Sequence, residues 1–140
     1  MKTFELRDSE GATFAVVSKD EDKPWIYVQW LGKIKTNELR RVMIQYIDVL
    51  STTRCPFVLS DRRKSSGNVI DISNFIEHKW ASKAVEAGLQ CVANVTAPSA
   101  ISQITSLILS NRMLGFEFKS FQDIEDAEKW LMEKAATAQL

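Results

Sequence analysis

The sequence has few of the residues that carry catalytic chemistry or hold a cofactor. A Ser-His-Asp or Cys-His arrangement would have to use its one histidine, His78, which is predicted to lie mid-helix and away from the apolar face, as a solvated or partly packed residue. Its five glycines form neither a G-x-G-x-x-G nor a Walker A loop. Cys55 and Cys91 form no C-x-x-C pair, and each lies in or beside an apolar run, as expected for a small buried side chain. We therefore expect no metal, no cofactor and no enzymatic activity.

An excess of charge and long apolar runs are also missing. Lysine plus arginine and aspartate plus glutamate number 18 each, so the net charge is zero. A dedicated nucleic-acid-binding protein usually carries a basic excess, so nucleic acid is not an expected partner. No run is apolar for long enough to span a bilayer, and the N-terminus lacks the apolar stretch of a signal peptide. These absences predict a cytoplasmic protein with no membrane span.

The residues that are present predict one α/β domain. The 140 residues are 45% hydrophobic, which suits a single domain over 1–140 with a core at about 3–134. Three strand-like runs come first, at 3–7, 12–18 and 25–31, and Gly32 is expected to end the third. An amphipathic helix should follow Thr36, because apolar residues recur there at helical spacing. They are Leu39, Val42, Met43, Tyr46, Ile47 and Leu50.

Helix and strand alternate through the rest of the chain. Strands are predicted at 57–59, 89–95 and 116–118. Between them lie a helix ended by Gly88 and a helix opened by Pro98, and Asp123 caps a final helix whose last residues, from Ala135, should fray. The predicted apolar face of the first of these helices is Ile72, Phe75, Ile76, Trp80, Ala84 and Ala87. The order βββαβαβαβα predicts a mixed sheet with a parallel portion flanked by helices.

A polar, basic segment follows the strand at 57–59 and is the best candidate for a binding site. Asp61, Arg62 and Arg63 lie just past the carboxyl end of that strand, where ligands of open α/β sheets collect. Three more polar residues should approach the same edge: Asn94, Thr96 and Ser99. Together they would form a locally positive pocket for an anion or an acidic peptide. The alternative is a solvated turn that contains a structural Asp61–arginine pair.

Three segments of the chain resemble a known family. The segment 27–36 is similar to the family's strand, glycine and helix-opening threonine, and 57–63 is similar to its strand ending in aspartate and a basic residue. The segment 121–131 is similar to its terminal F-x-D-x-x-x-A-x-x-W-L. This pattern resembles the STAS domain of bacterial anti-sigma-factor antagonists. It resembles more closely the small SpoIIAA-like proteins, which are structurally akin to lipid-transfer CRAL-TRIO domains.

The resemblance implies a bacterial, non-enzymatic regulatory module that binds another protein. In the antagonists, the serine of an Asp-Ser-Ser-Gly run is phosphorylated by a kinase partner. Here 64–67 is Lys-Ser-Ser-Gly, with Lys64 in place of the aspartate. Ser65 and Ser66 are thus candidate binding and phosphorylation residues, and the alternative is ordinary loop composition.

Two further kinds of partner are expected. The helix after Pro98 has apolar residues over more than a narrow stripe, which favours a homodimer through Ile101, Ile104 and Ile108. The kinship with CRAL-TRIO domains instead implies a small-molecule or lipid-binding domain. That alternative needs an apolar cavity between helices and sheet, lined by residues such as Trp80, Ile104, Ile108 and Leu114.

Overall fold

One six-stranded mixed sheet organises the chain. The computed structural model describes residues 2–33, 36–66, 80–96 and 115–138. Within them the sheet has the order β1-β2-β3-β5-β7-β8. Its strands are β1 (Lys2–Arg7), β2 (Thr13–Lys19), β3 (Ile26–Trp30), β5 (Phe57–Asp61), β7 (Cys91–Val95) and β8 (Glu117–Phe121). β1, β2 and β3 pair antiparallel, and β3, β5, β7 and β8 pair parallel, which confirms the predicted mixed sheet.

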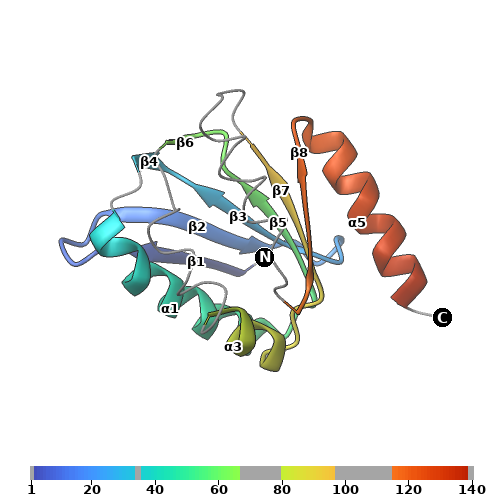
Figure 1. Cartoon of the computed structure of the whole chain (residues 1–140), viewed down its shortest axis with the longest axis horizontal. Coiled ribbons are helices and arrows are strands. Elements are labelled where there is room, and N and C mark those ends of the chain that lie inside the picture. Colours follow the sequence, from blue (N-terminus) through green and yellow to red (C-terminus); the bar gives the residue numbers. More distant parts are fainter. Residues whose placement is uncertain (1, 34–35, 67–79, 97–114, 139–140) are drawn as a thin grey trace.

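The described helices lie on both sides of this sheet. Figure 1 shows α1 (Thr36–Thr53) and α3 (Ala81–Glu86) together on one face, here called the α1 face. The third described helix, α5 (Ile124–Ala138), covers the opposite face, here called the α5 face. Helices on both faces allow the parallel strands to be apolar on both sides. Accordingly, every residue of β5 and of β7 is buried.

Aromatic side chains fill the core on the α1 face. Val42, Met43, Tyr46 and Leu50 of α1 are buried as the helical stripe predicts. Trp80 is also buried and packs edge-on against Tyr46, with ring centroids 5.3 Å apart, and against Phe116, at 6.2 Å. Its indole N–H donates to the Met43 carbonyl at 2.8 Å, so the polar atom of this large apolar side chain is satisfied.

α5 covers the parallel half of the α5 face. Asp123 caps it as predicted, because its Oδ1 accepts from the Glu125 backbone N–H at 2.9 Å. Ala127 and Leu131 are fully buried, at helical spacing. The expected fraying from Ala135 is wrong: α5 continues to Ala138 and Ala135 is buried, since the apolar spacing from Ala127 and Leu131 continues to it.

Three strand predictions need correction. The last strand, predicted at 116–118, is β8 at Glu117–Phe121, because parallel pairing with β7 extends it. The third strand, predicted at 25–31 and ended by Gly32, is β3 and ends at Trp30, with Gly32 past its end at a positive φ of 70°. Ser65–Ser66 is not a plain loop. Instead β4 (Gly32–Lys33) and β6 (Ser65–Ser66) pair in parallel beyond the main sheet (Figure 1). The Gly32 N–H donates to the Lys64 carbonyl at 3.0 Å, a contact between distant segments that local patterns cannot predict.

Several predictions concern residues outside the described ones. They include His78, the helix after Pro98 and the proposed dimer residues Ile101, Ile104 and Ile108. Within the described ranges, no helix combines the length and the apolar character needed to cross a membrane.

Candidate functional site

The predicted site residues meet where β5 and β7 end. Asp61 is the last residue of β5 and pairs with Val95, the last residue of β7. The Arg62 backbone N–H donates to the Val95 carbonyl at 2.8 Å, and the Thr96 N–H donates to the Phe121 carbonyl at 2.9 Å. Hydrogen bonding between the strands therefore continues one residue past their ends. This register brings Asp61, Arg62 and Thr96 to one edge of the sheet, with Asn94 one pleat behind.

Asp61 is the centre of a hydrogen-bonded cluster on the α5 face. Its side chain is almost fully buried and accepts two hydrogen bonds from the Arg63 guanidinium, Nε to Oδ1 at 2.9 Å and Nη2 to Oδ2 at 2.7 Å. The Arg63 backbone N–H also donates to Oδ1, at 3.0 Å, and the Tyr27 hydroxyl donates to Oδ2. Asp61 is therefore satisfied as a carboxylate, in the bidentate geometry that makes arginine–carboxylate pairs strong.

The pKa values in this cluster reflect burial and pairing. Burial alone would raise the pKa of Asp61, but the hydrogen bonds from Arg63 and Tyr27 outweigh it and the pKa is lowered. Burial, reinforced by the Asp61 hydrogen bond, raises the pKa of Tyr27 to about 12. At neutral pH the cluster therefore consists of an ionised Asp61, a charged Arg63 and a neutral Tyr27.

Arg62 has a different environment from Arg63. The guanidinium of Arg63 folds back onto Asp61 on the α5 face, whereas Arg62 is the first residue past the end of β5. Burial lowers the pKa of Arg62 to about 10, although part of its surface remains accessible to water. Its guanidinium makes no hydrogen bond or ion pair with the part of the chain that the structure describes. Arg62 is thus a desolvated cation, whereas the charge of Arg63 is balanced by Asp61.

Polar side chains lie in a row across the α1 face next to Arg62. Ser60, Asn94 and Ser120 are neighbours across β5, β7 and β8, one pleat back from the edge. The Trp30 indole N–H donates to the Ser60 hydroxyl at 2.9 Å. The Ser120 Oγ is buried and has no hydrogen-bond partner among the described residues. The sequence analysis missed Ser60 and Ser120. The signal for Ser60 was a polar residue directly after the apolar run 57–59, whereas β8 has only two apolar residues and gave no such signal for Ser120.

The candidate phosphorylation residues lie beside this edge. The Ser65 side chain is buried, and its hydroxyl donates to the Arg62 carbonyl at 3.1 Å. Ser66 follows in β6, which pairs with β4. Ser99 lies outside the described residues. The hydroxyl of Ser65 is therefore used to close the turn between β5 and β6.

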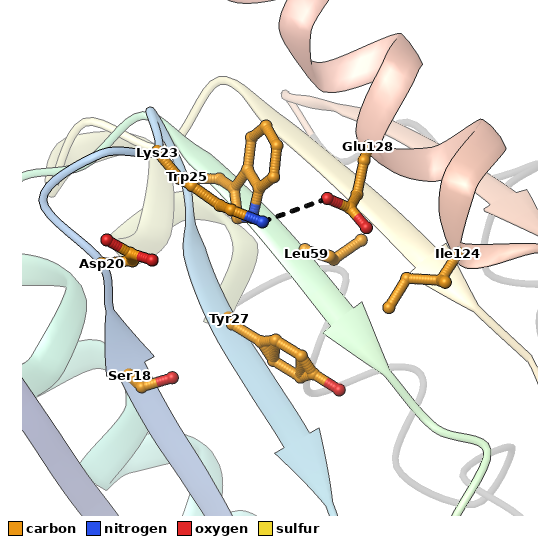
Figure 2. A pocket seen from close by; sticks show the side chains of 8 residues that line it. All are labelled: Ser18, Asp20, Lys23, Trp25, Tyr27, Leu59, Ile124 and Glu128. Atoms are coloured by element: carbon orange, nitrogen blue, oxygen red, sulfur yellow. Dashed lines mark hydrogen bonds and ion pairs between the residues drawn. The ribbon is translucent and has the colours of Figure 1, made fainter.

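A pocket of about 190 Å³ lies elsewhere, on the α5 face. Figure 2 shows it between the end of β2, the start of β3 and the first turns of α5. Its lining residues combine aromatic, aliphatic and charged side chains: Ser18, Asp20, Lys23, Trp25, Tyr27, Leu59, Ile124 and Glu128. The sequence analysis missed this pocket, because its walls come from segments that are distant in the chain.

The buried cysteines and the described carboxylates do not form a reactive or metal-binding cluster. Burial, with the Glu117 hydrogen bond, raises the pKa of Cys91 to about 12, so its thiol is protonated at neutral pH. Cys55 is buried as well, with its Sγ within 3.3 Å of the Pro24 and Phe57 carbonyls. Across the described ranges, no three potential metal ligands gather at one place.

Comparison with known proteins identifies the fold. No family model matches the chain, and no curated protein does either. Among solved structures, the chain is similar to an uncharacterised protein of the DUF3478 family with a SpoIIAA-like fold from Shewanella loihica PV-4. The two share 18% sequence identity and superpose with a TM-score of 0.53, over 84% of this chain and 91% of that one. The chain therefore has a SpoIIAA-like fold, as its sequence patterns predicted.

Proposed function

We propose that this protein is a non-enzymatic, regulatory binding module that holds an acidic segment of a protein partner at the carboxyl ends of β5 and β7. Arg62 is its anchor. The observation that carries the proposal is the contrast between two adjacent arginines. Asp61 accepts a bidentate pair of hydrogen bonds from Arg63, whereas the guanidinium of Arg62 is largely desolvated and has no partner among the described residues.

An unpaired, desolvated guanidinium favours binding of an anion. Folding has already removed much of the water from Arg62. Binding of a carboxylate or phosphate therefore requires little further desolvation of the guanidinium. The planar guanidinium can donate two parallel hydrogen bonds to such a group. Asn94 and Thr96 are polar neighbours on the adjacent strand, at the same edge. The site therefore suits the side chain of an acidic residue or a phosphorylated one.

The candidate nucleophile at this edge is not activated, because the Ser65 hydroxyl donates to a backbone carbonyl rather than to a base. Cys91 lies at the other end of β7, and its raised pKa keeps its thiol protonated, whereas thiolate is the reactive form. These contacts support binding rather than catalysis as the role of the edge.

A labelled hexaglutamate peptide tests the proposal by fluorescence anisotropy. We expect the wild type to bind it and Arg62→Ala to bind about tenfold more weakly, because a charge-assisted pair is lost. Lys64→Ala is the matched control, since it removes one positive charge from an exposed side chain in the same turn. It should bind within about twofold of the wild type. Arg62→Lys should fall between, because lysine keeps the charge but not the planar fork. If Arg62→Ala and Lys64→Ala lose equal affinity for the peptide, binding depends only on the total positive charge of this turn, and the proposal is refuted.

We also propose, from the sequence, where the protein is located and how it assembles. We expect it to be a bacterial cytoplasmic protein that forms a homodimer through the segment containing Ile101, Ile104 and Ile108. Zero net charge offers little electrostatic opposition to self-association. Light scattering at high protein concentration tests the dimer, and a strict monomer would contradict it.

Small-molecule or lipid binding is the second candidate function. The sequence predicts an apolar cavity between helices and sheet, lined in part by Trp80. Trp80 packs on Tyr46 and Phe116, and the other residues expected to line that cavity, Ile104, Ile108 and Leu114, lie outside the described residues. The pocket on the α5 face favours a small ligand at a different place. Native mass spectrometry of the purified protein distinguishes this candidate function from the first, because a lipid carrier should copurify with an apolar ligand of several hundred daltons.

A further inference from the structure

The pocket on the α5 face is independent of the Arg62 edge. Arg62 is not among the residues that line the pocket. Trp25, directly before β3, forms the floor with Tyr27 of β3 and Leu59 of β5, and Ile124 and Glu128 of α5 form one wall (Figure 2). Asp20 and Lys23 of the loop between β2 and β3 form the wall opposite.

The loop wall is held in place by its own hydrogen bonds. The Asp22 backbone N–H donates to Asp20 Oδ1 at 3.0 Å, and the Lys23 N–H donates to the Asp20 carbonyl at 3.1 Å. The Lys19 ammonium donates to the carbonyls of Asp20 and Lys23 across the turn. This part of the pocket is therefore preformed, which lowers the entropic cost of binding a ligand there.

The charges and rings of the pocket favour a cation. Asp20 and Glu128 contribute two carboxylates, against the single positive charge of Lys23. Trp25 and Tyr27 present aromatic rings, whose faces attract cations. Tyr27 stays neutral at neutral pH, because burial and Asp61 raise its pKa to about 12. With Lys23 turned away, the walls would hold two negative charges over an aromatic and aliphatic floor.

Lys23 already places an ammonium group in this pocket. Its Nζ lies 3.3 Å from Glu128 Oε2 and 5.5 Å from the centroid of the Trp25 ring. Figure 2 shows the amine extending past Trp25 towards Glu128. These are the two contacts that the ammonium of a ligand would make: an ion pair and a cation–π contact. The Lys23 side chain is 46% exposed, so it is free to swing into solvent when a ligand replaces it.

We propose that this pocket binds a small organic ammonium group, which displaces the Lys23 ammonium from Glu128 and Trp25. Lys23 then acts as an internal competitor that occupies the site when no ligand is bound. A free amine and a lysine side chain of a partner protein both carry this group, so the recognising chemistry is the same.

Choline chloride and n-butylammonium chloride are the probes, titrated into the full chain and followed by amide and indole NMR shifts. We expect saturable shifts at the loop 19–25 and in the first turns of α5. The neutral isostere of choline, 3,3-dimethyl-1-butanol, should give none, because it lacks the charge that the carboxylates recognise.

Variants at the two exposed charges test the competition. Lys23→Ala should bind choline about three- to tenfold more tightly than the wild type, because an exposed ion pair and a cation–π contact no longer compete. Glu128→Gln should bind about threefold more weakly or worse. The matched control, Lys129→Ala, removes one positive charge from an exposed residue of α5 that does not line the pocket, and it should bind like the wild type.

A short peptide with a single lysine distinguishes the two sources of the ammonium. Binding tenfold tighter than that of n-butylammonium supports a partner's lysine side chain, whereas binding no tighter supports a free amine. The proposal is overturned if Lys23→Ala shows no saturable binding, if it binds more weakly than the wild type, or if the neutral isostere binds as well as choline. Arg62→Ala should leave the titration unchanged, so the outcome is separate from that of the proposed function.

Discussion

Arg63 holds the buried carboxylate of Asp61 with two parallel hydrogen bonds, Nε to Oδ1 at 2.9 Å and Nη2 to Oδ2 at 2.7 Å. The two partners differ in exposure: the side chain of Asp61 is 2% exposed and that of Arg63 is 43% exposed. Removing one partner or the other therefore leaves different groups behind. Without Asp61, the arginine can be solvated, whereas without Arg63 the carboxylate stays buried.

This asymmetry predicts the order of two substitutions. Arg63→Met should lower the free energy of unfolding by about 2–3 kcal/mol, because it leaves a buried carboxylate with fewer donors. Asp61→Asn should cost less, about 1–2 kcal/mol, because the amide oxygen still accepts from Tyr27 and no buried charge remains. The double variant should cost less than the sum of the two. Urea unfolding measures all three, and additive losses would show that the pair is not coupled.

The same pair predicts how stability depends on pH. The pKa of Asp61 is lowered in the folded protein, so ionised Asp61 contributes stability above its unfolded pKa, near 3.9. That contribution is lost as the pH falls through the lower, folded pKa. The difference in unfolding free energy between wild type and Asp61→Asn should therefore be constant above about pH 5 and shrink below about pH 4. Urea unfolding at pH 7, 5 and 3 checks this, and a difference that grows on acidification would contradict it.

Arg62 should respond to substitution in the opposite sense to Arg63. It is desolvated without a partner among the described residues, so its charge opposes folding. Arg62→Met keeps the length of the apolar stem and should be neutral or raise the free energy of unfolding by up to about 1 kcal/mol. A loss comparable to that of Arg63→Met, measured by the same urea titration, would mean that Arg62 is part of the structural framework. Gained stability with lost peptide binding would mark Arg62 as a functional residue.

The convergence of residues at this edge could be predicted because it follows from topology. Parallel strands end at one edge, so the residues after 57–59 had to lie beside the end of the strand at 89–95, as Asp61 and Arg62 lie beside Val95. The caps and stripes of α1 and α5 were predictable for a related reason, since each depends on residues within a few turns of one another. Which arginine pairs with Asp61 was left open by the sequence analysis, and the structure shows that it is Arg63.

Contacts that depend on register between strands or on packing could not be predicted. Tyr27 reaches Asp61 because Gln29 pairs with Asp61 across β3 and β5, and nothing in either strand specifies that alignment. Lys23 meets Glu128 across 105 residues of sequence, once α5 has docked on the sheet. Charged residues on separate loops and helices carry no local signal of such a contact. The pocket could therefore be recognised only in three dimensions.

Gly88 was predicted from the sequence alone to end a helix, and this role can be tested. It follows α3 at a positive φ of 105°, and its N–H donates to the Val85 carbonyl at 2.9 Å while the Leu89 N–H donates to the Ala84 carbonyl at 3.0 Å. A Cβ atom added there would meet nothing within 4 Å, so the cost of Gly88→Ala should come from backbone strain alone.

We expect Gly88→Ala to lower the free energy of unfolding by about 1–2 kcal/mol without changing the fold, because L-residues are disfavoured at this φ. Glu86→Ala, at an exposed position of the same helix, is the control and should change it by less than about 0.5 kcal/mol. Thermal or urea unfolding measures both. If Gly88→Ala were as stable as the wild type, the turn after α3 would have to adopt another conformation at no cost, and Gly88 would not be what ends this helix.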